Sequence, residues 1–447
     1  MKIRTPLALA SVLLLVSVGA FASGDSDEAS SDEPVPLILS AWGGQEVADF
    51  YAASAAEFSR LSEGRVDATF RHITADYNQK VQAMIAAGDA PDVFLLGSSH
   101  APLWWRKGLL LEVTEAVHEH GLLDDSKWYS SLFSSSRDGD TFFGLPDAMN
   151  VFLLIYNKTA FDKYGVAHPT DDWTWDDVKA AAMQLTVDEN GDGVNDLWGF
   201  NIWHAWSMWY QVFLWSWGAE WSIDEHEANT LPWLAGKDWR QGQMVDSGAA
   251  AALRWLQDGI YKDEFIRPRV GATVAGEAFQ QGLVAMDIVG TWYLETTILV
   301  EDFEWDIAPI PRVGKGDPHT TQMTVSPWVV NARTKYPLAG RELAAFMCCN
   351  TFVMETMRRD TPLSKEVSFS DAYLKIPGAP PSYRLRVDII DMIEHPRYWN
   401  RQNPNAGEIE QALNTEMEKL LINAQSPEDT AANVDKEVAR LIAKGWE

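Results

Sequence analysis

The sequence predicts an α/β fold, in which helices cover a sheet of parallel strands. The first hundred residues alternate between strand-like and helix-like apolar patterns, in the order β-α-β-α-β. Parallel strands need crossover connections of this kind, so the order indicates a parallel sheet. The composition agrees, because 447 residues with 46% hydrophobic and 22% charged side chains can fold into two or three domain-sized units.

The early elements follow from the spacing of apolar residues. Short apolar or alternating segments predict strands, and segments with helical spacing predict helices: strands at 37–41, 66–73 and 93–96, helices at 47–61 and 77–87. In parallel sheets, ligands bind beyond the carboxyl ends of the strands. The sequence therefore predicts a binding edge at residues 42–45 and 97–99.

Capping signals mark the helices further along the chain. Thr174 and Asp177 have the spacing of a capping box, for a helix that extends to Leu185. Apolar side chains between residues 409 and 420 fall on one helical face. Ser426 followed by Pro427 is typical of an N-cap and first turn, and predicts a final helix.

The amino terminus is typical of an export signal. Residues 1–22 combine a short basic region, an apolar run too short to span a bilayer with ease, and an Ala-x-Ala cleavage site. Residues 23–36 are rich in Ser, Asp and Glu and predict a flexible lead-in. The only cysteines are Cys348 and Cys349, so no lipid-anchor cysteine follows the signal. We expect an exported protein, periplasmic or extracellular, without a disulfide framework.

The net charge excludes some classes of partner. A formal charge of −28 argues against nucleic acid, since phosphate binding needs clustered Lys and Arg, and against an anionic membrane surface. The charge is compatible with a neutral or cationic ligand, and equally with acidity that serves solubility alone.

Tryptophan is the most unusual feature of the composition. The chain has 21 tryptophans, and nine of them lie between Trp198 and Trp239. An indole offers a large apolar face and one N–H donor, which suits a sugar ring with its apolar faces and hydroxyl rim. Large aromatic side chains are usually buried, so the count alone favours core packing for any single tryptophan.

Five segments stand out along the chain: AAGDAPDVFLL at 86–96, DGDTFFGLPDAMNVFLLIYNKTAFDKYGV at 138–166, Thr174-Trp175, AFQQGLVAMDIVGTWYLET at 278–296 and WDIAPIP at 305–311. Together they resemble a known family, the carbohydrate-binding solute-binding proteins of bacterial ABC transporters, which include maltose-binding protein. Each motif alone is weak, and their order and spacing over residues 37–442 carry the resemblance.

The resemblance implies a two-lobed periplasmic binding protein fold of class II, with a mainly parallel sheet in each lobe and a ligand cleft between the lobes. The first lobe would comprise residues 37–146 and 327–370, and the second residues 147–326 and 371–447. Crossings near 145–150, 320–330 and 365–375 would join them. By resemblance, a monomer would close on a sugar and deliver it to ABC permease subunits, and the aromatic residues favour an oligosaccharide.

The resemblance also carries a set of ligand-binding candidates, position by position. They follow predicted strands, lie at the crossings, close the segment at 278–296 or occupy a late loop: Trp42, Gln45, Asp76, Ser98, Ser99, Asp147, Asn150, Gly290, Thr291, Trp292, Trp328, Trp399 and Arg401. Within the tryptophan-rich stretch we add Trp206 and Trp209, whose three-residue spacing predicts one helical face and suits a core equally well. Gly290 would let the backbone approach a ligand.

One acidic loop copies part of a calcium-binding pattern. Asp188, Asn190, Asp192, Val194 and Asp196 match the first nine positions of an EF-hand loop, but position twelve is Gly199 instead of Glu. A hydrogen-bonded turn explains the same residues, so a structural calcium ion stays a secondary hypothesis, and no other cofactor is expected.

Two other functions remain open. The scaffold could instead bind a polyamine, which acids and aromatic residues suit, or a glycerol phosphate ester, which would need several arginines. A secreted glycoside hydrolase would need two carboxylates flanking the bond, and no local pattern singles out such a pair. The chain also lacks G-x-S-x-G, H-E-x-x-H and P-loop motifs. The sequence therefore favours a binding protein over an enzyme.

Overall fold

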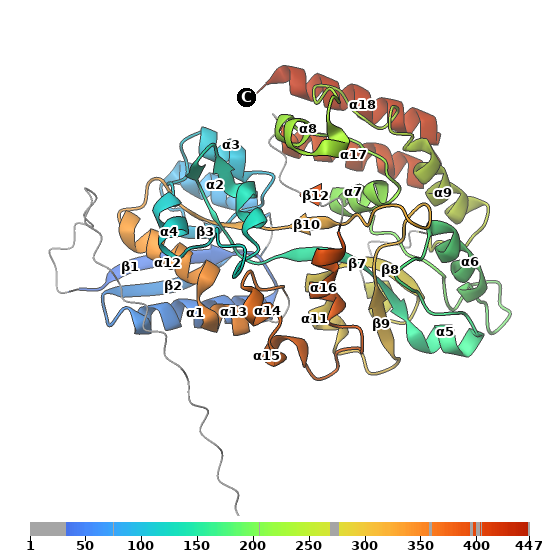
Figure 1. Ribbon diagram of the computed structural model, residues 1–447, viewed down its shortest axis with the longest axis horizontal. Helices are drawn as coiled ribbons and strands as arrows, with labels where there is room; N and C mark the ends of the chain where they lie inside the picture. Colours follow the sequence, from blue (N-terminus) through green and yellow to red (C-terminus); the bar gives the residue numbers. More distant parts are fainter. Residues whose placement is uncertain are drawn as a thin grey trace, which may run out of the picture.

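The computed structural model describes residues 33–74, 76–204, 206–268, 277–356, 360–393, 397–398, 403 and 405–445. The chain forms two α/β lobes, each built around its own five-stranded sheet, and strands β7 and β10 lie where the lobes meet (Figure 1). The expected signal peptide at 1–22 and residues 23–32 of the expected lead-in lie outside the described residues. No helix in the described ranges is long and apolar enough to cross a membrane.

The sheet of the first lobe has the strand order β2-β1-β3-β11-β6. Its strands are β1 (Val35–Ala41), β2 (Val66–His72), β3 (Val93–Leu95), β6 (Leu145–Pro146) and β11 (Pro327–Val330). The predicted strands at 37–41, 66–73 and 93–96 are confirmed. β1 pairs in parallel with β2 and β3, as the alternating pattern predicts. β11 returns from the second lobe and pairs antiparallel with β3 and β6.

Helices cover this sheet, and a small ribbon lies beside it. The helices are α1 (Gln45–Leu61), α2 (Tyr77–Ala87), α3 (Ala101–Arg106), α4 (Thr114–Glu119), α12 (Pro337–Cys349), α13 (Thr351–Thr356) and the 3-10 helix η1 (Ser130–Ser136). The ribbon consists of β4 (Arg137–Asp138) and β5 (Thr141–Phe142). Gly88 ends α2 in the left-handed conformation, with φ of +76°, which explains the glycine at this position.

The sheet of the second lobe centres on β7, which is entirely buried. Its strands are β7 (Asn150–Asn157), β8 (Met286–Gly290), β9 (Trp305–Ala308), β10 (Gln322–Thr324) and β12 (Arg397–Tyr398). The expectation of a mainly parallel sheet is wrong here, because β7 pairs antiparallel with β8, β9 and β10, and only β10 and β12 run parallel. The chain enters this lobe along β7 and leaves it along β10, so these two strands run in opposite directions.

Helices surround this sheet, and α7, α9, α17 and α18 pack on one another above it in the view of Figure 1. The helices are α5 (Lys158–Tyr164), α6 (Trp175–Leu185), α7 (Ser207–Ser216), α8 (Glu225–Thr230), α9 (Ala250–Tyr261), α10 (Glu277–Gln280), α11 (Leu294–Thr297), α16 (Leu385–Met392), α17 (Ala406–Leu421) and α18 (Pro427–Lys444), with 3-10 turns η2 (Pro232–Leu234) and η3 (Thr291–Tyr293). Both arms of the predicted Thr174–Asp177 capping box are present. Ser426 caps α18 as predicted, by accepting the N–H of Asp429.

Three stretches of chain pass between the sheets. The first joins β6 to β7 at residues 147–149, and the second joins β10 to β11 at residues 325–326. The third contains α14 (Lys365–Ser368) and α15 (Asp371–Leu374), before Ser382 bonds Asp306 of β9. Met149 of the first stretch exchanges two backbone hydrogen bonds with Thr361, which begins the third stretch. The exact division of the chain into lobes by residue number stays a prediction.

Candidate functional site

The strand directions bring the candidate residues to two facing edges. β1, β3 and β6 point the same way, because β11 is antiparallel to both β3 and β6. Their carboxyl ends therefore share the edge of the first sheet from which residues 147–149 lead into β7. In the second sheet, the start of β7 lies beside the end of β8, with Phe152 opposite Gly290. The crossings connect these two edges.

At the edge of the first lobe, Trp42 follows β1 and is partly exposed. Its ring meets the ring of Tyr77 edge to face, at 5.4 Å between centroids. Gly43 follows with φ of +136°, and a Cβ there would lie 2.6 Å from Val47, so only glycine fits. A His72 ring nitrogen lies 2.8 Å from the Gly43 carbonyl oxygen, which ties the loop to the end of β2. The loop that presents Trp42 is thus fixed from both sides.

Ser98 and Ser99 follow β3 at the same edge. The Oγ atom of Ser98 is buried and has no hydrogen-bond partner among the described residues. The Oγ atom of Ser99 lies 3.1 Å from Nδ1 of His100. Gly97, before them, leaves room for the Asn78 amide, which a Cβ would meet at 3.1 Å. Small polar groups therefore dominate this part of the edge.

Asp147 ties two of the crossings together. Its backbone N–H donates to the Ser326 carbonyl at 2.9 Å, and its Oδ1 accepts the Ser326 N–H at 3.1 Å. The side chain is 6% exposed. At least one of its carboxylate oxygens thus holds the neighbouring crossing, a structural role that sequence reasoning did not predict.

At the edge of the second lobe, Asn150 and Thr291 are brought together as neighbours. The Thr291 hydroxyl donates to Oδ1 of Asn150 at 2.8 Å, and its oxygen accepts the Val151 N–H at 3.3 Å. Both side chains are buried. This pair joins the start of β7 to the end of β8.

Beside this pair lies a group of rings that we call the aromatic cluster: Phe152, Trp203, Trp206, Trp292 and Tyr293. Trp206 stacks on Trp203 with 4.8 Å between centroids, and meets Trp292 edge to face at 6.0 Å. Phe152 contacts both Trp206 and Trp292. Trp206 and Trp292 are partly exposed, whereas Phe152, Trp203 and Tyr293 are buried. Two candidate tryptophans from distant parts of the sequence thus share one surface.

Trp209 and Trp328 do not offer a face to a ligand. The side chain of Trp209 is fully buried in α7 and stacks on Phe213, while that of Trp328 is fully buried against Tyr51 of α1. The expectation that Trp206 and Trp209 share one helical face is wrong, because Trp206 is the extended N-cap residue before α7, with φ of −131°. Both buried indoles serve the core.

Gly290 has a structural reason that the sequence did not reveal. A Cβ on Gly290 would lie 2.1 Å from the Trp292 ring. The Trp292 indole therefore occupies the space over this glycine, and the approach of the Gly290 backbone to a ligand stays a prediction.

The remaining candidates are exposed or undescribed. Gln45 is exposed and donates to Asp49 within α1. Asp76 is exposed and begins α2 in the left-handed conformation, without a side-chain cap. Trp399 and Arg401 lie outside the described residues.

Sequence reasoning missed a buried acid beneath the aromatic cluster. Asp287 of β8 is fully buried, and its Oδ2 accepts hydrogen bonds from Nδ2 of Asn201 and Nε1 of Trp203, each at 2.9 Å. Burial raises the pKa of Asp287 to about 7, although these two hydrogen bonds oppose the rise. The signal was available in the segment 278–296, where Asp287 interrupts an apolar strand.

The acidic loop forms a network of internal hydrogen bonds. The two carboxylate oxygens of Asp188 accept the N–H groups of Gly191 and Gly193, and Asp196 accepts the N–H of Glu189. Within the described ranges, no three His, Cys, Asp or Glu side chains gather as a metal site would require. Calcium binding here stays a prediction, which titration calorimetry with calcium chloride tests.

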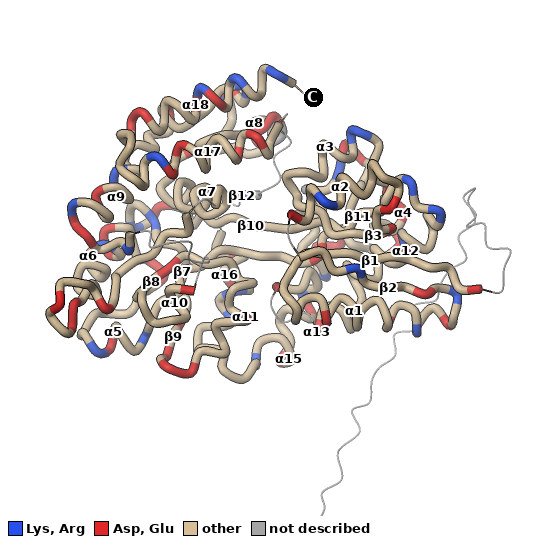
Figure 2. Tube along the Cα trace, turned by 180° about the vertical axis from the view of Figure 1, so that it is seen from behind, with Lys and Arg blue, Asp and Glu red and all other residues tan. Residues whose placement is uncertain are grey.

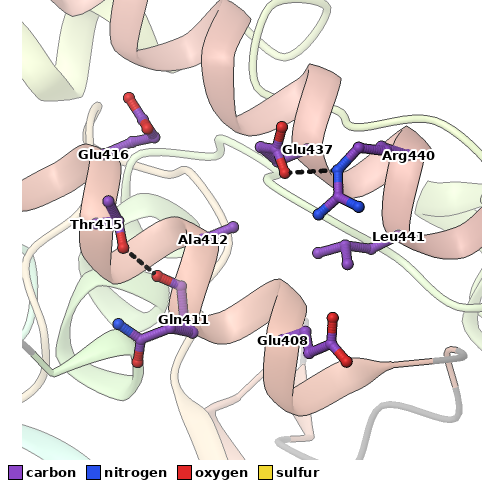
Figure 3. A pocket seen from close by; sticks show the side chains of 8 residues that line it. All are labelled: Glu408, Gln411, Ala412, Thr415, Glu416, Glu437, Arg440 and Leu441. Carbon is purple, nitrogen blue, oxygen red and sulfur yellow. Dashed lines mark hydrogen bonds and ion pairs between the residues drawn. The ribbon is translucent and has the colours of Figure 1, made fainter.

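A groove of about 350 Å³ lies elsewhere, between α17 and α18 (Figure 3). Its walls include Glu408, Thr415 and Glu437, and Glu437 pairs with Arg440 across 2.9 Å. Helices α17 and α18 lie at the outer side of the second lobe (Figure 1), so this groove is separate from the two edges.

Charged residues gather away from the strands at the crossings. In Figure 2, Lys, Arg, Asp and Glu mark mainly the outer helices and loops, while the tube through β10 is tan. β7 and β10 contain no charged residue. The candidate residues that the structure places at the two edges are thus mainly aromatic or neutral, with Asp147 as the acid among them.

The comparisons with known proteins agree with this architecture. The family model described as "Bacterial extracellular solute-binding protein" matches residues 44–348. A Brucella abortus protein described as a "Putative binding protein" is 26% identical over 259 residues, and the match spans 56% of each protein. The chain thus spans about half the length of the curated relatives it matches.

Solved structures share the fold. An ABC substrate-binding protein of Listeria monocytogenes in complex with cycloalternan has a TM-score of 0.77 and 20% identity, over 92% of this chain and 100% of that one. UgpB of Mycobacterium tuberculosis in complex with glycerophosphocholine has a TM-score of 0.75 and 15% identity, over 93% and 99%. At these identities the likeness shows the two-lobed fold.

Proposed function

The chain belongs to the bacterial extracellular solute-binding protein family, and we propose that it captures a sugar between its lobes and delivers it to an ABC importer. The observation that carries the proposal is the aromatic cluster beside the Asn150–Thr291 pair. Partly exposed indoles can cover the apolar faces of a sugar ring, while small polar groups bond its hydroxyls.

The chemistry of the two edges supports a neutral ligand. Trp42, Ser98, Asn150, Thr291, Trp206 and Trp292 supply apolar faces and neutral hydrogen-bonding groups. A phosphate ester would favour arginines and a polyamine would favour several carboxylates, because charge pairs with charge. The family likeness adds that the Listeria monocytogenes protein holds cycloalternan, a carbohydrate.

Closure of the lobes would complete the site. The crossings at 147–149 and 325–326 are short and held to each other by Asp147 and Ser326. Hinge motion about such crossings is an established mode of ligand capture. We propose binding without catalysis, so oligosaccharides incubated with the protein should remain intact, and turnover would contradict the proposal.

A thermal-shift screen of the protein against cycloalternan, maltotriose, glycerophosphocholine and spermidine tests the ligand class. A ligand at 100 times its dissociation constant should stabilise the fold by roughly 2.7 kcal/mol. We expect a shift with a carbohydrate. A shift with spermidine alone would overturn the carbohydrate assignment.

Glycerophosphocholine is the second candidate, because the Mycobacterium tuberculosis neighbour is in complex with it. The ester also has hydroxyls, and its choline group would suit an indole face, since quaternary ammonium ions bind aromatic cages. A shift with glycerophosphocholine and none with either sugar would favour this reading.

A further inference from the structure

The carboxyl of Asp287 is buried where the expected function does not use it. It lies on β8, three residues before Gly290 at the edge, and its side chain is fully buried. The hydrogen bonds from Asn201 and Trp203 converge on one oxygen, Oδ2. The Ile288 backbone N–H and the Trp209 indole also act to lower the pKa of this carboxyl. Burying an acid in this way is costly. A carboxyl group adds no apolar packing to the core, so the burial of Asp287 needs another explanation.

The two donors lead from Asp287 to the exposed surface. Asn201 belongs to a segment that runs beside β8, where the Asn201 N–H donates to the Met286 carbonyl at 3.1 Å. Trp203 follows, and its Nε1 atom donates to Asp287. The Trp203 ring then stacks on Trp206, with 22° between the ring planes. One face of Trp206 is therefore covered by Trp203.

We propose that Asp287 is a positioning residue for the ligand surface: it holds the Trp203 indole, and Trp203 sets the plane of Trp206 for the ligand. The inference rests on the proposed function only in that Trp206 meets the ligand. An indole held by one N–H bond cannot turn in its plane without breaking that bond. The stacked partner loses the same freedom, which lowers the cost of ordering the site on binding.

Ionisation of Asp287 should affect the exposed Trp206 ring through the same contacts with Trp203. A charged carboxylate accepts hydrogen bonds more strongly than a neutral acid, so deprotonation tightens the hold on Trp203. Tyr293 of η3 interacts electrostatically with Asp287, and Glu277 of α10 with Tyr293. His204, next to Trp203, lies instead 3.6 Å from Glu418 of α17. The pKa of Asp287 near 7 places this change within the physiological range.

Asp287 makes the stability of the fold change with pH in the direction opposite to that of a salt-bridged acid. The folded protein binds the proton more tightly than the unfolded chain, because burial raises the pKa from 3.8 to about 7. The stabilising contribution of the protonated group is therefore complete below pH 3.8 and is lost as pH rises to about 7. Asp287→Asn should remove this loss, so its melting temperature should depend less on pH between 5 and 8 than that of the wild type.

The test of positioning uses the full chain labelled with 5-fluorotryptophan, and needs no ligand. Substitution Trp203→Phe and Trp206→Phe assigns the two fluorine resonances. Asp287→Leu removes the acceptor and should shift both resonances, and Asp287→Asn, which keeps an oxygen acceptor, should leave them near the wild-type positions at pH 6. Asp435→Asn is the control: Asp435 of α18 also accepts two N–H groups and has a raised pKa, but it bonds Met244 and Val245.

Unmoved Trp203 and Trp206 resonances in both Asp287 variants would overturn the proposal. If Asp287→Leu does not fold, the pH titration decides: both wild-type resonances should move with a midpoint near pH 7, and those of Asp287→Asn should stay constant. Equal titration in both proteins would also overturn it. Affinity for cycloalternan is the second readout, with at least a fivefold loss expected in Asp287→Leu and none in Asp435→Asn. If the wild-type protein binds no ligand in the screen, the proposed function fails. The fluorine spectra still decide the role of Asp287 in that case.

Discussion

The two facing edges differ in the residues that they present. The edge of the first lobe presents one partly exposed tryptophan, Trp42, among glycines and serines. The edge of the second lobe presents Trp206 and Trp292, backed by three buried rings. Apolar surface contributes in proportion to its area. We therefore expect the second lobe to supply most of the affinity for a ligand, and the first lobe to add hydrogen bonds if the lobes close.

The backing of the two edges also differs. Within the described ranges, the Trp42 ring packs on one other ring, that of Tyr77, and the loop around it is fixed by Gly43 and His72. Trp206 contacts Phe152, Trp203 and Trp292. A ring with several packed neighbours is more rigid, so it loses less freedom on binding. Substitutions in the two edges should therefore differ in size.

The largest effect is expected for Trp206→Ala. Removal of the stacked ring takes away a binding face, and central tryptophans of binding sites contribute roughly 2 kcal/mol or more. We expect affinity for the carbohydrate found in the screen to fall about 30-fold to 100-fold. Isothermal titration calorimetry measures the change.

The matched control is Trp239→Ala. Trp239 comes from the same tryptophan-rich stretch and is also partly exposed, but it lies under the Arg240 guanidinium in the loop that packs near Asp435 of α18. Its substitution should leave affinity unchanged. Equal losses for Trp206→Ala and Trp239→Ala would show that the aromatic cluster has no special part in binding.

An intermediate effect is expected for Trp42→Ala, because the first edge has one exposed ring instead of two. A loss of about tenfold in affinity corresponds to roughly 1.4 kcal/mol. Trp105→Ala serves as control, since Trp105 is partly exposed in the same lobe but stacks on Phe143 and donates to Asp138. A larger loss for Trp42→Ala than for Trp206→Ala would reverse the comparison of the two lobes.

Much of the fold could be predicted because local patterns agree with it. The apolar runs at 37–41 and 93–96, the alternation at 66–73 and the Thr174–Asp177 capping box are short-range signals, and each is read within a few residues. The antiparallel pairing of β7 with β8, β9 and β10 could not be predicted in this way. It depends on where the chain crosses between the lobes, which is a long-range property.

The candidate site was predictable only in part for the same reason. Residue type places Trp206, Trp209 and Trp328 in one class, yet only Trp206 is partly exposed. Trp206 lies one residue before the start of α7, whereas Trp209 lies inside that helix. Trp328 of β11 is buried against Tyr51. Asp287 was missed because a single acid in an apolar segment has no spacing pattern, and its partners come from a distant loop.

The smallest effect is expected for Ser98→Ala, and it sharpens the view that the first edge contributes through hydrogen bonds. The Ser98 hydroxyl is buried and has no protein partner among the described residues, so its removal should leave thermal stability unchanged or slightly higher. If lobe closure brings a ligand hydroxyl to it, affinity should still fall about threefold, or roughly 0.7 kcal/mol. Ser99→Ala is the control, because its hydroxyl already faces His100. An affinity loss in Ser99→Ala but not in Ser98→Ala would place the ligand on the other side of this loop, and would move the first-lobe contact from the end of β3 towards α3.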